Sequence, residues 1–167
     1  MRRISTLLLT SLLFLASCGG SADPAEQTKA GERALGTQDF SAALSEFQGA
    51  LSAIGDNPQD PLYLRAKLGE IEARATTDAA KAKDDLIALA AALPGKVSDR
   101  DFNRIASRMG DAGLFSEAIA LLAKAEELFP DSEHLKKLGA KLAENAQKAG
   151  DSSAMDALAG LGYVGDN

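Results

Sequence analysis

The sequence predicts an all-α fold, a short solenoid of helix hairpins, and three observations support this prediction. The 167-residue chain has no tryptophan and is only 5% aromatic, whereas alanine, leucine, glutamate and lysine, all good helix formers, are abundant. Apolar residues follow helical spacing along most of the chain. The clearest pattern begins at Phe40, Ala79 and Phe115, at offsets of 39 and 36 residues. Periods in this range are typical of stacked two-helix units.

Three related apolar stripes predict the second helix of each hairpin. The first comprises Phe40, Ala43, Leu44, Phe47, Ala50, Leu51 and Ile54. The third repeats it with Phe115, Ala118, Ile119, Leu122, Ala125, Leu128 and Phe129. The middle stripe is weaker, with Ala79, Ala82, Leu86, Leu89 and Leu93, and it has Lys83 where the others have leucine or isoleucine. Together the stripes predict helices over about 40–54, 79–93 and 115–129.

A further helix precedes each of these stripes. The second hairpin has Leu64, Leu68, Ile71 and Ala75, and the third has Phe102, Ile105, Ala106 and Met109. The first hairpin has the small-residue run Ala30, Gly31, Ala34 and Leu35. Short polar breaks at 36–39, 76–78 and 110–113 separate the two helices of a hairpin, and the longer breaks 55–61 and 94–98 separate hairpins.

After Pro130 the sequence predicts a capping helix. Ser132 is a good N-cap residue, and a single apolar stripe of Leu135, Leu138, Leu142 and Ala146 follows it. A solenoid needs such a helix to cover its last apolar surface. A short helix over 152–161 then ends at Gly162, which suits a left-handed C-cap. For the tail around Tyr163, either helix capping or a docking peptide for a partner is open.

The third hairpin resembles the tetratricopeptide repeat through Ala106, Gly113, Phe115, Ala118, Ile119, Leu122, Ala125 and Pro130. The first hairpin matches through Gly31, Phe40, Ala43, Leu44, Phe47, Ala50 and Leu51. The middle hairpin departs from the pattern, because it lacks the aromatic residue and carries Lys83. The resemblance covers about residues 25–150 and implies a short right-handed α-solenoid with a C-terminal capping helix; an irregular helical bundle is the alternative.

The same resemblance implies a groove lined by the first helix of each hairpin. The family's groove positions fall on Arg100, Asn103 and Ser107 in the third hairpin, and on Lys67 and Arg74 in the second. A basic inner face on an acidic protein would favour acidic segments or C-terminal carboxylates. We therefore expect an unidentified protein or peptide partner at these five residues.

The amino terminus has the organisation of a secretion signal. Arg2 and Arg3 precede an apolar stretch, 7–15, which is too short for a stable transmembrane helix of roughly 20 residues. The stretch ends at Leu-Ala-Ser-Cys, and Cys18 is the only cysteine. This motif resembles the lipobox of bacterial lipoproteins, which implies cleavage before Cys18 and lipid on its thiol. Lipoproteins that are kept in the inner membrane often carry Asp directly after the lipidated cysteine, whereas this chain has Gly19 there. The resemblance therefore implies an outer-membrane protein that faces the periplasm.

These patterns divide the chain into a signal peptide (1–17), a lipidated cysteine with a flexible tether (18–27), a repeat domain (28–150) and a short helix with a tail (151–167). Removing residues 1–17, which contain two arginines and no acidic residue, changes the formal net charge from −6 to −8. Nucleic-acid binding needs basic patches, so we expect none from a chain this acidic. With Cys18 acylated, we expect no disulfide.

No combination of residues predicts catalysis, a metal site or a cofactor other than the covalent lipid. His134 is the only histidine and is expected at the surface, without the partner and cleft that a general base needs. The adjacent carboxylates of Asp84 and Asp85 point about 100° apart on a helix, so they are expected to be solvated. The polar loop 56–60 lacks the glycine and glutamate of a calcium loop and is expected to be a capped loop. We expect a non-enzymatic protein without a small-molecule substrate.

The function expected from the sequence is that of a membrane-anchored scaffold, which holds another protein in its groove. One alternative is an assembly factor, similar to a pilotin, that escorts a component of a secretion system, a pilus or the outer membrane. The other is an enzyme whose site the sequence does not reveal.

Overall fold

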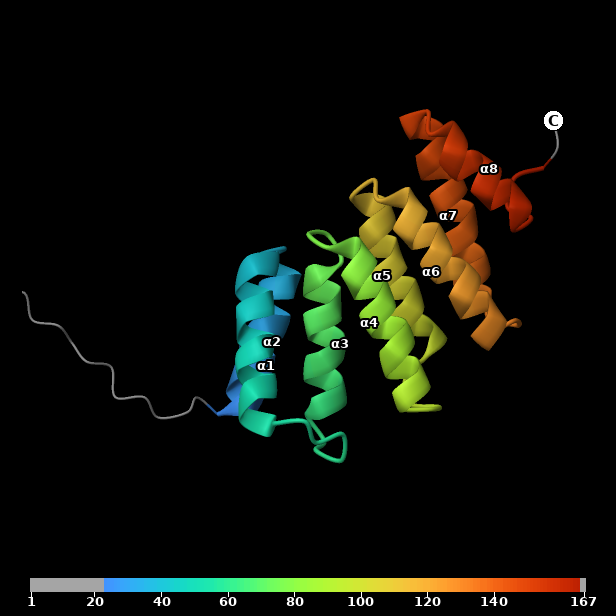
Figure 1. The fold of residues 1–167 in the computed structure, drawn as a ribbon. Coiled ribbons are helices and arrows are strands. Elements are labelled where there is room, and N and C mark those ends of the chain that lie inside the picture. Colours follow the sequence, from blue (N-terminus) through green and yellow to red (C-terminus); the bar gives the residue numbers. More distant parts are fainter. Residues whose placement is uncertain (1–22, 166–167) are drawn as a thin grey trace, which may run out of the picture.

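The computed structural model describes residues 23–165, and within this range the protein is entirely α-helical, with eight helices and no strand (Figure 1). The all-α prediction is therefore confirmed. The helices are α1 (Pro24–Gly36), α2 (Phe40–Ile54), α3 (Tyr63–Arg74), α4 (Ala79–Ala92), α5 (Asp99–Asp111), α6 (Phe115–Leu128), α7 (Glu133–Ala149) and α8 (Ser152–Gly160).

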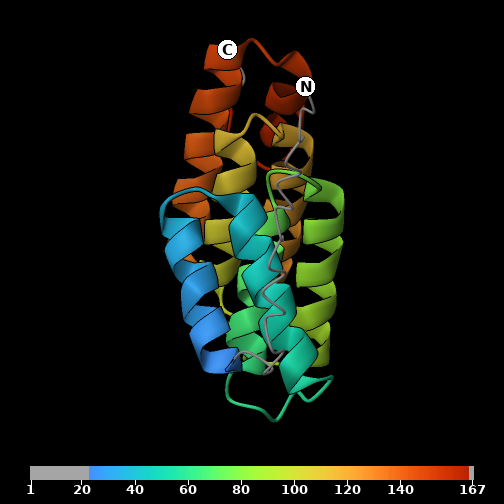
Figure 2. The same ribbon diagram turned by 90° about the vertical axis from the view of Figure 1, so that its left-hand side faces the viewer.

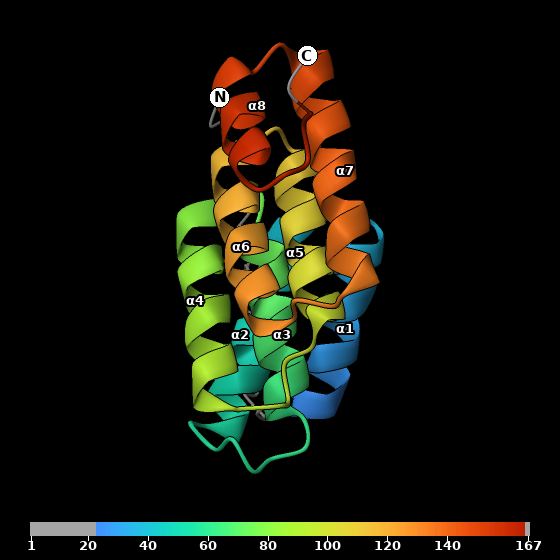
Figure 3. The same ribbon diagram turned by 90° about the vertical axis from the view of Figure 1, so that its right-hand side faces the viewer.

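Consecutive helices pair as hairpins, and the hairpins lie side by side in chain order (Figure 1). The first helices form one row, because α1 packs on α3, α3 on α5 and α5 on α7. Among the second helices, α4 packs on α6 and α6 on α8, while α2 packs mainly between α1 and α3. Viewed from the far end, α5 and α7 form one layer, and α4, α6 and α8 form the other (Figure 3).

Four helices end in the same left-handed turn, a Schellman motif. After α8, the N–H of Tyr163 donates to the Leu158 carbonyl at 2.9 Å, and Gly162, with φ 85°, donates to Ala159. This confirms the predicted C-cap at Gly162. Gly113 and Gly150 play the same part after α5 and α7. After α1 the position is held by Gln38, the one described non-glycine residue with positive φ, at 60°.

The buried apolar residues form two separate clusters. The small cluster comprises Leu35, Ala43, Phe47, Ala50, Ala66 and Ala73, so it joins α1 and α2 to one side of α3. The Phe47 ring fills the space over Gly31 and Gly69, where a Cβ atom would overlap it. The large cluster begins on the other side of α3 with Leu68 and Ile71 and extends through α8.

The helix boundaries agree closely with the sequence prediction except at the start of the domain. Residues 19–27 were predicted to be a flexible tether, but α1 already begins at Pro24. The Asp23 side chain caps it by accepting from the N–H of Ala25 at 2.9 Å, and Pro24 suits the first helical position. The lipobox, Cys18 and tether residues 19–22 lie outside the described residues.

Candidate functional site

The row of first helices carries every arginine that follows the predicted signal peptide of this acidic chain. Six arginines follow the predicted signal peptide, and four of them are Arg65 on α3 and Arg100, Arg104 and Arg108 on α5. The three on α5 are spaced four residues apart, which places them along one side of that helix. We call these four residues the arginine row.

Carboxylates on neighbouring first helices hold the arginine row in place. Arg65 makes a bidentate pair with Glu32 of α1, and this hydrogen-bonded carboxylate raises the pKa of the Arg65 guanidinium. Arg104 and Arg108 of α5 both pair with Glu72 of α3, at 2.8 and 2.6 Å. The Glu72 side chain is only 4% exposed. A buried carboxylate needs such partners, because an isolated charge would be costly to bury.

The predicted groove residues Arg100 and Asn103 contact α7. The Nε of Arg100 donates to Nε2 of His134 at 3.2 Å, and the Asn103 side-chain amide donates to the His134 carbonyl at 2.8 Å. His134 is exposed, as predicted, yet it contributes to the contact between these helices. Ser107 is half-buried on α5 between Arg104 and Asp111, and Asp111 pairs with Lys141 of α7 at 2.7 Å.

Lys67 and Arg74 do not lie with the other predicted groove residues, and their role in binding stays a prediction. Both pair with Glu70, at 2.8 and 2.6 Å, and Arg74 also reaches Asp85 of α4 at 2.6 Å. Burial raises the pKa of Glu70, but the hydrogen bonds from these two cations outweigh burial and hold the pKa below its usual value. Lys67 and Arg74 therefore belong to a polar cluster around Glu70 and Asp85.

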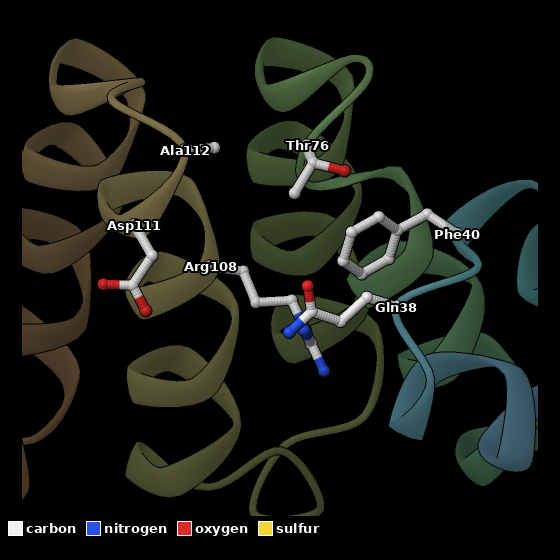
Figure 4. Close-up of a pocket in the computed structure, with 6 residues that line it drawn as sticks. All are labelled: Gln38, Phe40, Thr76, Arg108, Asp111 and Ala112. Carbon is white, nitrogen blue, oxygen red and sulfur yellow. The ribbon is translucent and has the colours of Figure 1, made fainter.

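A pocket of about 230 Å³ lies at the hairpin-turn end of the arginine row (Figure 4). The Arg108 guanidinium lies 5.2 Å from the centre of the Phe40 ring, a cation–π contact that ties α5 to the first hairpin. Gln38, with its positive φ, lines the same pocket. The buried Oγ1 of Thr76 has no hydrogen-bond partner in the structure. Asp111 and Ala112 complete the lining.

A second, smaller cavity of about 130 Å³ opens between α1, α3 and α5. Its lining includes Phe47 from the small cluster and the charged side chains Glu72, Asp101 and Arg104. The arginine row thus runs past two hollows, one at its middle and one at its end. These hollows and the row are the candidate functional site.

The C-terminal tail packs on its own chain. The Tyr163 ring lies over Gly139 of α7, where a Cβ atom would overlap it. The hydroxyl of Tyr163 donates to Glu126 of α6 and lies 3.4 Å from the Leu135 carbonyl. Burial raises the pKa of the Tyr163 phenol, and the hydrogen bond to Glu126 raises it further. The ring therefore occupies, over Gly139, a place like that of Phe47 over Gly31 and Gly69.

The remaining polar residues singled out in the sequence are exposed or make local contacts. Asp85 turns to Arg74, whereas Asp84 is exposed. In the loop 55–62, Asn57 and Asp60 accept hydrogen bonds from the N–H groups of Gln59 and Leu62, at 3.2 and 2.8 Å, so the predicted capped loop is confirmed. No group of three potential metal ligands gathers among the described residues. None of the described helices has the length and apolar composition that crossing a bilayer requires.

Comparisons with family models, with curated proteins and with solved structures find no match to this chain.

Proposed function

We propose that this protein is a lipid-anchored envelope protein that holds an acidic segment of another protein against its arginine row. The observation that carries the proposal is that all six arginines after the predicted signal peptide lie on first helices, four of them in the arginine row, in a chain whose predicted mature charge is −8. Arg104 and Arg108 are partners of buried Glu72, but Arg65, Arg100 and Arg104 remain exposed on an acidic protein. Exposed arginines in such a setting suggest recognition of negative charge.

We further propose that the hairpins form a right-handed solenoid similar to tetratricopeptide repeats. Two features support this: the first helices stack in an uninterrupted row, and Phe47 fits between Gly31 of one hairpin and Gly69 of the next. Stacked hairpins of this kind present an extended surface to peptides or helices.

The arginine row favours a ligand with carboxylates at several points along its length. An arginine guanidinium can bind a carboxylate through two parallel N–H donors, which fixes direction as well as charge. Glu32 holds the Arg65 guanidinium, and Glu72 holds those of Arg104 and Arg108, so these carboxylates orient three members of the row. Arg100, whose neighbour His134 carries no carboxylate, is the member most available for a ligand.

The anchor rests on the lipobox ending at Cys18. Growing cells with labelled fatty acid should label the wild-type protein and the Ser17→Ala control, which keeps a small residue before the cysteine. Cys18→Ser should remain unlabelled and unprocessed. A labelled Cys18→Ser protein would refute the lipid anchor.

Binding can be tested with fluorescent peptides rich in glutamate and matched peptides rich in glutamine. Arg100→Glu combined with Arg104→Glu should weaken binding of the acidic peptide by at least about tenfold, a loss of about 1.4 kcal/mol. The control, Lys96→Glu combined with Lys124→Glu, changes the net charge equally but lies outside the row. Equal weakening by both double variants, or no preference for the acidic peptide, would refute the proposed site.

A further inference from the structure

The short connection between Cys18 and the first helix restricts where the domain can lie. Asp23 caps α1, so five Cα-to-Cα steps join it to Cys18. Extended chain spans at most about 3.6 Å per residue, so the start of α1 lies within about 18 Å of the cysteine. A lipid-anchored Cys18 therefore brings this end of the domain close to the bilayer surface.

The register of the first hairpin identifies what else lies at this end. Phe47 lies over Gly31, and Gln27 lies beside Gly49, so the start of α1 is next to the end of α2. The loop 55–62 follows α2 directly, and Figure 2 shows it at the same end of the molecule as the start of α1. The turn 37–39 lies at the opposite end, and the 15-residue α2 separates the two ends by about 22 Å.

Acidic side chains dominate this corner. Within residues 23–29 and 55–62, Asp23, Glu26, Asp56 and Asp60 outnumber the single cation Lys29, which already pairs with Glu26 at 2.9 Å. Arg65, just after the loop, is already paired with Glu32 of α1. Near an anionic lipid surface each Lys or Arg contributes about 1 kcal/mol to membrane binding, whereas carboxylates are repelled. The corner is therefore suited to lie in the water layer above a zwitterionic bilayer, near the headgroups and without binding them.

Resting on the lipid anchor proposed above, we propose that the corner formed by the start of α1 and the loop 55–62 faces the bilayer, while the hairpin turns face away from it. The pocket of Figure 4, built on the turns at Gln38 and Thr76, then opens on the side remote from the membrane. The arginine row runs from the membrane side toward that pocket, where a soluble partner can reach it.

Quenching by headgroup-labelled lipids tests this orientation. The acylated full-length protein, carrying a fluorophore on Asn57→Cys in the loop or on Thr77→Cys in a hairpin turn, is reconstituted in phosphatidylcholine vesicles. Both positions are exposed. We expect the Asn57 probe to be quenched at least about twice as strongly as the Thr77 probe, because the 12-residue α3 separates the loop from this turn by about 18 Å.

Equal quenching, or stronger quenching at Thr77, would overturn the orientation. If both labelled proteins fail to float with the vesicles, the anchor itself is refuted, and the orientation falls with it. These two failures are distinguishable, because flotation is measured before quenching. Replacing about a third of the lipid by phosphatidylglycerol should lower quenching at Asn57 at low salt, and about 0.5 M salt should reverse the change. Stronger quenching on the anionic vesicles would contradict the acidic corner as the membrane-facing surface.

Discussion

The first hairpin and the rest of the domain are stabilised by different means. In the first hairpin one aromatic ring, Phe47, packs among alanines and glycines, and the cluster ends on α3. From the second hairpin to α8, the cluster is continuous and built from larger aliphatic residues, with Phe102 packed edge-on against Phe129 at 5.9 Å between ring centres. Small residues allow close helix approach but contribute less buried apolar area.

The boundary between the two clusters runs along α3, and it is polar. Glu70, Glu72 and Arg74 are all buried on this helix, although they are charged. Breaking one partner of a buried pair costs more than a surface pair contributes. The comparison teaches that the first hairpin packs on α3 through small residues around one ring, whereas buried ion pairs join α3 to α4 and α5. The small cluster can therefore open as a separate unit.

The largest effect is expected from emptying each cluster of its central ring. Phe47→Ala and Phe102→Ala should each cost about 3–5 kcal/mol, because both rings are fully buried. Hydrogen exchange should separate the two variants. Phe47→Ala should remove protection from α1 and α2 while α5 to α7 stay protected, whereas Phe102→Ala should lower protection throughout. Uniform loss in both variants would refute a separable first hairpin.

A smaller effect is expected from filling the space that Phe47 occupies. Gly69→Ala places a Cβ atom inside the ring and should cost about 1–3 kcal/mol, the usual range for overpacking. Gly36→Ala is the matched control, because no atom lies within 4 Å of the Cβ it would add. Chemical denaturation measures both. Equal stability of the two variants would mean that the hairpins do not approach as closely as described.

Two opposite substitutions in the Schellman turns should change the free energy of unfolding by about 1 kcal/mol in opposite directions. Gln38→Gly should stabilise the first hairpin by about 0.5–1 kcal/mol, because a side chain at φ 60° is strained. Gly113→Gln places the same side chain at the equivalent turn, φ 76°, and should destabilise the domain by a similar amount. Nothing contacts a Cβ atom at Gly113, so the cost there is that of the backbone alone. Changes of the same sign would contradict this explanation.

The smallest effect concerns the tail at the far end and appears only at alkaline pH. The pKa of Tyr163 is raised in the folded protein, so the folded state keeps the phenol proton after the unfolded state has lost it. Stability is therefore unchanged below about pH 10 and falls as the pH rises further. Thermal melts of Tyr163→Phe, which has no phenol, should show a weaker alkaline decline. An identical decline would place the Tyr163 hydroxyl in solvent.

Much of the fold could be predicted from the sequence, because apolar stripes mark the helices that bury one face. The predicted starts at Phe40, Ala79 and Phe115 are the observed ones. The predicted tether was too long, since Asp23-Pro24 is a helix start whose signal resembles that of a linker. The lipobox and the partner remain predictions.

The site was harder to predict because α3 is buried on almost every side. A helix with one exposed face allows its polar residues to be assigned to solvent, but α3 contacts α1, α2, α4 and α5. Arg74 therefore pairs with Asp85 of α4 and Lys67 with Glu70 of its own helix, and neither joins the arginine row. The burial of Glu72 could not be predicted from hydropathy, because glutamate is ordinarily exposed. Only the spacing of Arg104 and Arg108, one turn apart on α5, indicates that both could reach one carboxylate.

Crosslinking in intact cells tests most directly whether the arginine row holds a partner. A photoreactive amino acid at Ser107, beside the row, should capture one acidic protein. The same group at exposed Ala88 on α4 should not. The captured band should disappear when Arg100→Glu and Arg104→Glu are added and persist with Lys96→Glu and Lys124→Glu. A band of equal strength from Ala88, or one that survives reversal of the two arginines, would contradict binding at the arginine row.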